Sequence, residues 1–317
     1  MRIGLNESVQ KELEKKRYGI YNHSGVEICE WNRKALRGEG DCYKAKFYNA
    51  HTSRCMQFSP AVAHCNQNCL FCWRPNEVMC PSLKGVVDDP KEIVENLIEA
   101  RKKQLMGFGG NSAVPEERFI ESLEPDHFAI SLSGEPTLYP KIIGLIEFLC
   151  KRARSVFLVT NGTRPDILGQ LRPHNNFQIY ISCNAPNEEI YKEICRPAKG
   201  TSWEDFLGGL DAMREFLGRT VLRMTFIRGL NDRSELIPEY QKLIERSGAD
   251  FIEVKSFMSL GYARKRLEYG KMLYFDEIRE IAEKLLEGIN YRYEDEHKPS
   301  RIVLLKRKDS NKDNFIA

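Results

Sequence analysis

The sequence lacks a long hydrophobic run, and its first residues contain no apolar segment of the secretory type. Its longest stretch free of charged residues lies between Arg54 and Arg74 and contains Pro60 and four amide side chains. A membrane-spanning helix needs about 20 predominantly apolar residues, so none is predicted in that stretch. We therefore expect a cytoplasmic protein that makes no membrane contact.

The chain also has little net charge, because 48 basic residues face 45 acidic ones and the balance is +3. A surface that binds nucleic acid must then come from local clusters of basic residues. Internal repeats and low-complexity segments are absent, which argues against solenoid and disordered classes. The 317 residues, 42% of them hydrophobic, suffice for one large α/β domain with extensions or for two domains.

Cysteine, in contrast, is plentiful and unevenly distributed. Seven of the ten cysteines lie between Cys29 and Cys80. A disulfide framework is not expected in a reducing compartment. A cluster of free thiols near the N-terminus therefore indicates metal binding.

The hydrophobic pattern alternates between short strands and amphipathic helices after residue 55. Six buried strands are predicted at 56–63, 128–132, 156–159, 178–183, 221–227 and 251–256, with helices between them and a last helix at 275–286. Repeated strand–helix units predict a parallel sheet, and six units are too few for a closed eight-stranded barrel.

The predicted fold class is thus α/β, a partial (β/α)6 barrel. We expect three segments: an irregular, cysteine-bearing extension at 1–55 with one short helix, the barrel at 56–290, and terminal strands with a basic tail at 291–317.

The strongest motif is C-x3-C-x2-C, formed by Cys65, Cys69 and Cys72 directly after the first predicted strand. Three thiolates in one loop can chelate a soft metal centre. On a four-iron cube, three protein ligands leave one iron open to a substrate. Zinc, completed by Cys55, His64 or Cys80, is an alternative, although the second C-x2-C pair of structural zinc sites is missing.

These residues resemble the radical S-adenosylmethionine (SAM) superfamily, in which Phe71 also matches the usual aromatic before the third cysteine. A second match is Gly134-Glu135-Pro136, which follows the second predicted strand. The resemblance implies a four-iron cluster, a partial barrel, and SAM bound through its amino group at Gly134 and Glu135. A simple strand-to-helix turn is the alternative for this tripeptide. Further candidate SAM contacts end the later strands or lie on them: Thr160, Asn161, Ser182, Asn184 and Arg223.

The extension contains a second set of three cysteines, Cys29, Cys42 and Cys55, whose spacing alone is not diagnostic. Free thiols are the simple interpretation, although a metal can also stabilise such a segment. The surrounding string from Leu36 to Tyr48 and the sequence from Cys72 to Pro75 resemble the archaeal tRNA 4-demethylwyosine synthases. That resemblance implies a second four-iron cluster on these three cysteines.

By the same resemblance, the chain condenses pyruvate with N1-methylguanosine at position 37 of phenylalanine tRNA. A radical would form at the N-methyl carbon and add to the pyruvate carbonyl carbon, and the pyruvate C1–C2 bond would then break. This makes the enzyme a carbon–carbon lyase in wybutosine biosynthesis. The eukaryotic members carry a flavodoxin domain that this sequence lacks, so we expect a separate electron donor of the ferredoxin or flavodoxin type.

A lysine beside the second cysteine set is the candidate for holding pyruvate as a Schiff base. Lys44 lies two residues after Cys42, which places both on one side of an extended backbone. A positive neighbour would lower the pKa of the amine and keep it nucleophilic. Lys46 is the second candidate. Phosphate contact or solvation is the alternative for both lysines, and the open iron of the second cluster is another way to hold pyruvate.

Two interleaved basic and aromatic stretches, 31–37 and 262–271, and the basic run 306–308 suit contact with an unstacked RNA loop, although charged helix faces have the same composition. We expect a monomer. Two other functions remain open from the sequence: another radical SAM enzyme with an auxiliary cluster, such as a glycyl-radical activase, or a non-enzymatic metal-binding module for RNA.

Overall fold

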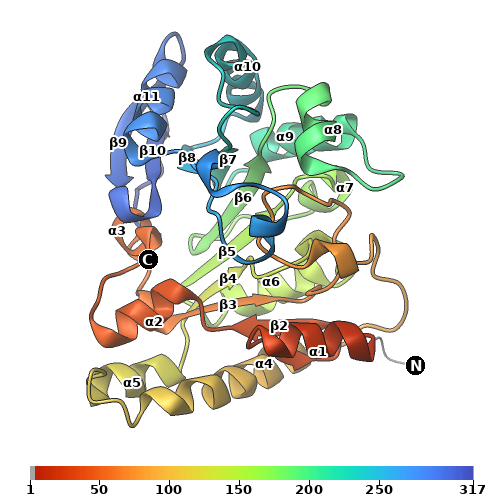
Figure 1. Ribbon diagram of the computed structural model, residues 1–317, viewed down its shortest axis with the longest axis vertical. Helices are drawn as coiled ribbons and strands as arrows, with labels where there is room; N and C mark the ends of the chain where they lie inside the picture. The colour runs from red at the N-terminus through yellow and green to blue at the C-terminus, as the bar shows by residue number, and fades with distance from the viewer. Residues whose placement is uncertain (1–3, 317) are drawn as a thin grey trace.

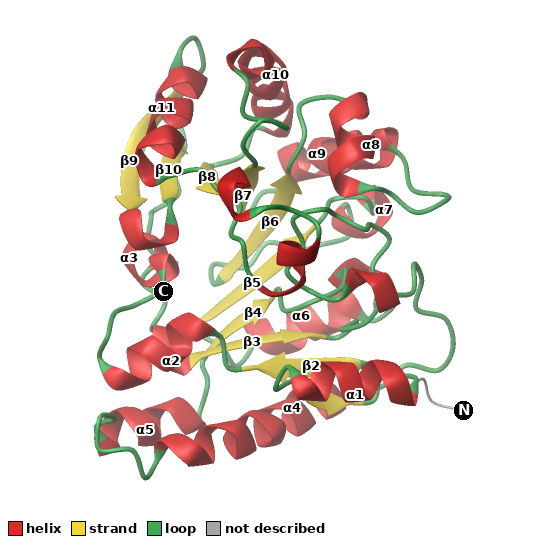
Figure 2. Cartoon of the chain, in the orientation of Figure 1, coloured by secondary structure: helices red, strands yellow, loops and turns green. Residues whose placement is uncertain are grey.

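The computed structural model describes residues 4–316, which form one ten-stranded sheet with helices on its outer side (Figure 1, Figure 2). The strand order is β1-β2-β3-β4-β5-β6-β7-β8-β10-β9. The six strands from β3 to β8 are all parallel and follow chain order. They are β3 (Cys55–Ser59), β4 (His127–Ile130), β5 (Ser155–Thr160), β6 (Phe177–Cys183), β7 (Arg219–Phe226) and β8 (Phe251–Ser256).

The parallel strands are connected by helices, which confirms the predicted (β/α)6 unit. The connecting helices are α4 (Pro90–Leu105), α5 (Glu116–Leu123), α6 (Ile142–Cys150), α7 (Pro165–Leu168), α8 (Glu188–Cys195), α9 (Trp203–Glu215) and α10 (Ile237–Ser247). The last helix, α11 (Phe275–Leu286), follows β8. The main hydrophobic core lies between these helices and the outer face of the sheet.

Antiparallel strands extend the parallel sheet at both edges. On one side β1 (Gly19–Tyr21) pairs with β2 (Ser24–Glu27), which pairs with β3. On the other side β10 (Ile302–Arg307) pairs with both β8 and β9 (Tyr291–His297). The two terminal strands were predicted, whereas the β1–β2 hairpin was missed because its short, glycine-containing strands lack a clear alternation.

The N-terminal extension is therefore not irregular, as the sequence had indicated. Besides the hairpin it contains α1 (Glu7–Lys15), α2 (Glu30–Arg37) and α3 (Tyr43–Tyr48). Its last cysteine, Cys55, is the first residue of β3. The extension is thus continuous with the sheet.

Two local predictions differ from the structure. The first strand ends at Ser59 rather than at residue 63, because Pro60 has no N–H to donate to a neighbouring strand. At the start of α4, the sequence from Asp89 to Glu92 predicts a capping box. Instead, the Asp89 side chain makes no capping hydrogen bond and pairs with Lys141 at 2.6 Å, while Glu92 accepts a hydrogen bond from Tyr21.

The inner face of the sheet is filled at its centre by α3. Phe47 and Tyr48 pack in a second hydrophobic cluster with Phe157, Tyr180 and Phe251 of the strands. The C-terminal segment closes over this helix, where the Ile316 amide donates to the Tyr48 carbonyl at 3.2 Å, and Figure 1 shows the two side by side.

Toward the carboxyl ends of the strands the inner face remains partly accessible. Side chains alternate between the two faces of a strand, and the partly exposed positions are alternate ones. We call this set the accessible inner row: Gln57, Val159, Ser182, Arg223, Thr225 and Lys255. Among the described residues, no helix has both the length and the apolar character needed to cross a membrane.

Candidate functional site

The cysteine loop that carries Cys65, Cys69 and Cys72 follows β3 and is fixed by backbone hydrogen bonds to α8. The Leu70 amide donates to the Ile194 carbonyl at 2.9 Å. Burial raises the pKa of the Cys72 thiol to about 11, and the nearby Cys69 contributes to the same shift. The thiols of Cys65 and Cys69 also act on each other. The structure thus brings the three predicted ligands together in one loop, where each is partly buried.

A second loop clamps the cysteine loop from the other side. Arg266 is largely buried and donates to the Cys72 carbonyl and to the Arg74 carbonyl. At Gly261 the backbone has φ +50° and a Cβ would lie 2.4 Å from the Trp73 carbonyl oxygen. This close contact requires glycine. Arg266 is therefore a structural clamp, and the sequence had wrongly grouped it with residues for RNA contact.

The Gly134-Glu135 turn follows β4 and lies against the cysteine loop. Gly134 has φ +73°, and a Cβ there would meet the Ala61 carbonyl oxygen at 1.9 Å. The Glu135 amide donates to the His64 carbonyl at 2.7 Å. The turn is thus held by backbone contacts that only glycine permits.

Glu135 is almost fully buried, and its carboxylate accepts four hydrogen bonds. The donors are the amide and hydroxyl of Thr137, the Thr160 hydroxyl at 2.6 Å and the Asn161 amide at 2.8 Å. Burial raises the pKa of Glu135, while these donors lower it. Glu135 thus braces the ends of β4 and β5, and its Oε2, which accepts only from Asn161, keeps a lone pair for an ammonium group.

The remaining SAM candidates divide into two groups. Asn161 donates to Asn66 of the cysteine loop at 2.7 Å, so Thr160 and Asn161 connect that loop to Glu135. Ser182 lies in the accessible inner row, and Asn184 is buried with an unpartnered Oδ1. Orphaned acceptors of this kind suit a polar ligand such as SAM.

The three cysteines of the extension are brought together by α2, α3 and β3. Cys29 precedes α2 and Cys42 precedes α3, each as the capping residue, while Cys55 begins β3. Burial raises the pKa of Cys42 to about 12 and of Cys55 to about 11, and Cys29 contributes to both shifts. The Asn32 side chain donates to the Cys55 carbonyl at 3.0 Å and so ties α2 to β3. Residues 13 positions apart thus form one group of thiols.

Neither cysteine group is arranged around a single ion. Among residues 4–316, no three histidine, cysteine or carboxylate side chains converge closely enough to hold one metal ion. Ligands of an iron-sulfur cube bind different irons, so they stand farther apart than the ligands of one zinc ion. The all-thiol donor sets suit such a cube.

Lys44 lies beside the extension cysteines, but not in the way the sequence predicted. Residues 43–48 are helical, so the expected extended backbone is wrong. The buried amine lies 4.2 Å from the centre of the Phe157 ring and 5.0 Å from that of Tyr180. Burial and then Arg223 lower its pKa. Within the described residues Lys44 forms no hydrogen bond or ion pair, so its amine is available to a ligand.

Lys46 is not brought to this group. Its amine pairs with Asp295 at 2.7 Å and donates to the Glu296 carbonyl, and half of the side chain is exposed. Of the two lysines, Lys44 alone lies with the extension cysteines.

Arg223 lies near Lys44 and is also the register partner of Ser182, another of the SAM candidates. Its Nε donates to Glu253 at 2.8 Å and its Nη2 donates to the Tyr43 hydroxyl at 2.7 Å. Glu253 also accepts from Tyr48 at 2.9 Å. Lys255, one step along β8, completes this charged group and was missed by the sequence analysis. The signal was present, since charged residues at alternate positions of a buried strand require partners or a ligand.

The basic patches are only partly available for RNA. In stretch 262–271, Tyr269 is well exposed and Lys265 lies 4.5 Å from the centre of the Tyr262 ring. In stretch 31–37, Lys34 covers Trp31 at 5.1 Å. The basic run at 306–308 is not free, because Lys306 is buried and donates to Asn314 at 2.9 Å.

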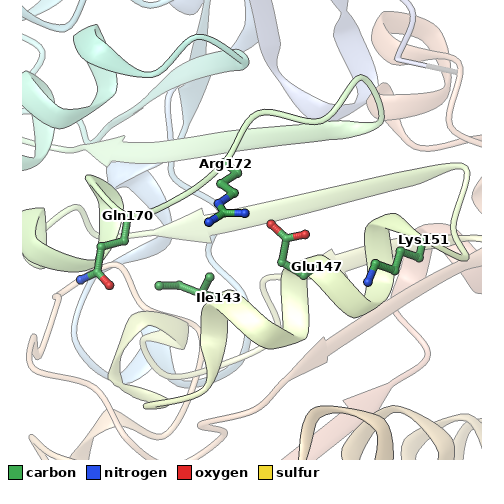
Figure 3. Close-up of a pocket in the computed structure, with 5 residues that line it drawn as sticks. All are labelled: Ile143, Glu147, Lys151, Gln170 and Arg172. Atoms are coloured by element: carbon green, nitrogen blue, oxygen red, sulfur yellow. The ribbon is translucent and has the colours of Figure 1, made fainter.

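A surface pocket elsewhere plays no part in this arrangement. Figure 3 shows it between α6 and the segment after α7, lined by Ile143, Glu147, Lys151, Gln170 and Arg172. None of these residues belongs to either cysteine group.

Known protein families and individual proteins are similar to this chain over most of its length. The sequence profile of the radical SAM superfamily matches residues 60–237, and that of wyosine base formation matches residues 246–307. The Pyrococcus abyssi protein named S-adenosyl-L-methionine-dependent tRNA 4-demethylwyosine synthase is 42% identical, over 96% of this chain and 90% of that protein. The Methanocaldococcus jannaschii protein of the same name is 40% identical, over 96% and 97%.

Two solved structures resemble the whole chain. That of TYW1 with a lysine-pyruvate adduct bound gives a TM-score of 0.87 at 39% identity, covering 96% of this chain and 97% of the other. That of archaeal TYW1 gives 0.78 at 35% identity, covering 96% and 98%. These relatives favour neither a glycyl-radical activase nor a non-enzymatic RNA-binding module. The chain belongs to the radical SAM superfamily and, within it, to the family of the S-adenosyl-L-methionine-dependent tRNA 4-demethylwyosine synthases.

Proposed function

We propose that this chain condenses pyruvate with N1-methylguanosine at position 37 of phenylalanine tRNA to give 4-demethylwyosine, acting as a carbon–carbon lyase. The observation that carries the proposal is the amine of Lys44, which is buried and unpartnered beside three cysteines of the extension. A relative at 39% identity has a lysine-pyruvate adduct in its solved structure, which supports the same role for a lysine of this chain.

The chemistry assigned to the chain's own residues begins at Lys44. Its neutral amine adds to the keto carbon of pyruvate, water leaves, and the resulting imine fixes the substrate inside the barrel. The lowered pKa of Lys44 keeps part of the amine unprotonated for this step. In the net reaction the N-methyl carbon loses a hydrogen and bonds to pyruvate C2, and the C1–C2 bond breaks with C1 leaving as a one-carbon fragment. The ring closes when the exocyclic amine of the guanine base displaces the Lys44 amine from C2.

Two four-iron clusters complete the proposed machinery, one on Cys65, Cys69 and Cys72, the other on the extension cysteines. When bound, the first supplies the electron that splits SAM and so starts the radical reaction. The all-thiol composition of both groups supports this assignment.

The same proposal covers the partners. The electron donor is a separate protein of the ferredoxin or flavodoxin type, and the enzyme acts as a cytoplasmic monomer. The tRNA docks through the exposed basic and aromatic residues around Tyr269 and Trp31, with the target base leaving its stack to enter the barrel.

The test compares wild type, Lys44→Met and Lys46→Met on N1-methylguanosine-37 tRNA with SAM, pyruvate and a reductant. We expect Lys44→Met to lower formation of the tricyclic base by at least about a hundredfold, as loss of a covalent group does. Cleavage of SAM to 5′-deoxyadenosine should persist, because Lys44 is not among the ligands of the C-x3-C-x2-C cluster and holds a different substrate. Lys46→Met should match wild type, since Lys46 pairs with Asp295 on the surface. Wild-type product formation without pyruvate would contradict the proposal.

A further inference from the structure

Arg101 of α4 is a buried cation that the proposed reaction leaves unused. Only 1% of the residue is exposed, and it is among the largest side chains that the structure buries completely. Its Nη1 donates to the carbonyl of Ser122 in α5. A guanidinium stays protonated in proteins, so a permanent positive charge lies inside the molecule at this point. Such a charge is costly unless an anion compensates it.

Carboxylates of the neighbouring segments do not compensate Arg101, because they pair with other cations. Glu124 pairs with Lys102 at 3.0 Å. Asp126 pairs with Arg54 at 2.8 Å. Within the part of the chain that the structure describes, Arg101 forms no ion pair, and its Nε has no hydrogen-bond partner. The protein therefore supplies this cation with no anion of its own.

The other hydrogen bonds of Arg101 lead to the cysteines of the extension. Its Nη2 donates to the carbonyls of Ser53 at 3.1 Å and Cys55 at 3.3 Å. The Asn32 side chain donates to the same two carbonyls, and the Asn32 amide donates to the thiol of Cys29 at 3.4 Å. Carbonyl groups carry no net charge. These bonds thus place the cation beside two of the three extension cysteines and leave its charge uncompensated.

We propose that Arg101 is the counter-cation of the iron-sulfur cluster on the three extension cysteines and raises its reduction potential. The inference rests on the proposed function, which assigns a cluster to these cysteines. An iron-sulfur cube with three thiolate ligands carries net negative charge, and one-electron reduction increases that charge. A fixed cation beside it favours the reduced form, because net charge and hydrogen bonding set such potentials. Arg101 is a positioning residue in this role, since it acts through the cluster and touches no substrate.

The experiment measures the midpoint potential of the extension cluster alone. Cys65, Cys69 and Cys72 are changed to Ala in every protein, the full chain is reconstituted without oxygen, and electron paramagnetic resonance follows a redox titration. Arg101→Gln removes the charge but keeps a hydrogen-bond donor. It should shift the midpoint to a more negative value, so that the ratio of reduced to oxidised cluster at the wild-type midpoint falls about tenfold. Arg101→Lys should stay close to wild type.

Lys103→Gln is the matched control, because it removes the same charge from an exposed side chain of the same helix. Its midpoint potential should equal that of wild type. An equal shift in Lys103→Gln and Arg101→Gln would overturn the role of Arg101, since any lost charge would then act alike. An unchanged midpoint in Arg101→Gln would overturn it as well.

Thermal unfolding with and without the cluster separates this role from a purely structural one. Arg101→Gln should lower Tm more in the cluster-bound protein than in the iron-free protein, because only the former contains the anion. Equal losses of Tm in both forms would overturn the inference. If Arg101→Gln binds no cluster, binding by Arg101→Lys supports the role of the charge, and failure of both variants contradicts it. Extension cysteines that bind no iron even with Arg101 present would overturn the second cluster of the proposed function and this inference with it.

Discussion

Single residues of the site are constrained more by backbone contacts than by their side-chain chemistry. Gly134 illustrates this, since its backbone lies against the carbonyls of Ala61 and His64. The resemblance found in the sequence implies that this tripeptide binds the amino group of SAM. The structure adds that the Glu135 carboxylate accepts hydrogen bonds from Thr137, Thr160 and Asn161. These bonds hold the carboxyl ends of two strands in place.

Gly134→Ala should therefore destabilise the protein and weaken SAM binding. The new Cβ would lie 1.9 Å from the Ala61 carbonyl oxygen, on a backbone with φ +73°. Overpacking and strain of this kind cost about 2–3 kcal/mol, which corresponds to a fall in Tm of roughly 5 °C or more. Thermal unfolding and equilibrium dialysis of SAM measure the two effects. Gly110→Ala is the matched control, because nothing lies within 4 Å of a Cβ at that position; equal Tm values for the two variants would refute the argument.

His127 of β4 predicts a pH dependence of stability. Its Nδ1 lies 2.7 Å from the Ser155 hydroxyl, and burial lowers its pKa to about 4. The folded state thus favours neutral histidine, while the unfolded chain protonates near pH 6.5. The contribution of neutral His127 to the free energy of unfolding is therefore complete above pH 6.5, and it is lost as the pH falls from there toward 4.

Urea unfolding at pH 7 and pH 5 should accordingly show a drop in the free energy of unfolding that is about 2 kcal/mol larger in wild type than in His127→Gln. Other groups titrate in both proteins, so only this difference reports on His127. An identical pH profile for the two proteins would show that the buried ring does not titrate as described.

At the scale of elements, the loop from 259 to 272 holds the cysteine loop. Arg266 donates to the carbonyls of Cys72 and Arg74 and to the side chain of Asn76. Gly261 allows the Tyr262 amide to reach the Trp73 carbonyl at 3.0 Å. This loop follows β8, so the last parallel strand of the barrel supports the ligands that follow the first.

Arg266→Ala should loosen the cysteine loop and speed the loss of iron to a chelator several-fold. The substitution leaves the carbonyls of Cys72 and Arg74 without this donor. Each buried carbonyl without a partner destabilises the loop by about 1 kcal/mol or more. Absorbance of the reconstituted protein during chelation measures the rate. Arg264→Ala is the neighbouring control, because Arg264 donates to Ser259 of its own loop. Iron loss at the wild-type rate in Arg266→Ala would mean that the clamp is not needed.

At the scale of the whole molecule, two cysteine groups share the barrel. Iron and acid-labile sulfide per chain distinguish them when the protein is reconstituted without oxygen. We expect about eight irons in wild type and about four when Cys29, Cys42 and Cys55 are all changed to Ala, because a cube contains four irons. About four irons in both proteins would remove the second cluster from the proposal. Zinc in place of iron would remove the radical reaction.

Much of the molecule was predictable from local pattern. The six parallel strands, the C-x3-C-x2-C loop and the Gly134-Glu135 turn follow from short-range signals, since each lies within a few residues of sequence. The helix 275–286 and the strand 251–256 agree with the structure to the residue. The family resemblance also rests on motifs of this short range. It predicted the same activity that the names of the relatives state.

Long-range relations were decided only by the tertiary structure. The sequence placed Lys44 on extended backbone with Lys46 as the second candidate, whereas α3 is helical and buries the amine of Lys44 while Lys46 stays half exposed. It did not show that Arg223 pairs with Glu253 across β7 and β8. Side chains that contact each other across 30 to 200 residues of the chain leave no pattern in the local sequence around either residue. The sequence by itself therefore determined which chemistry the chain carries, and packing of the extension into the barrel determined which amine and which charges meet in the site.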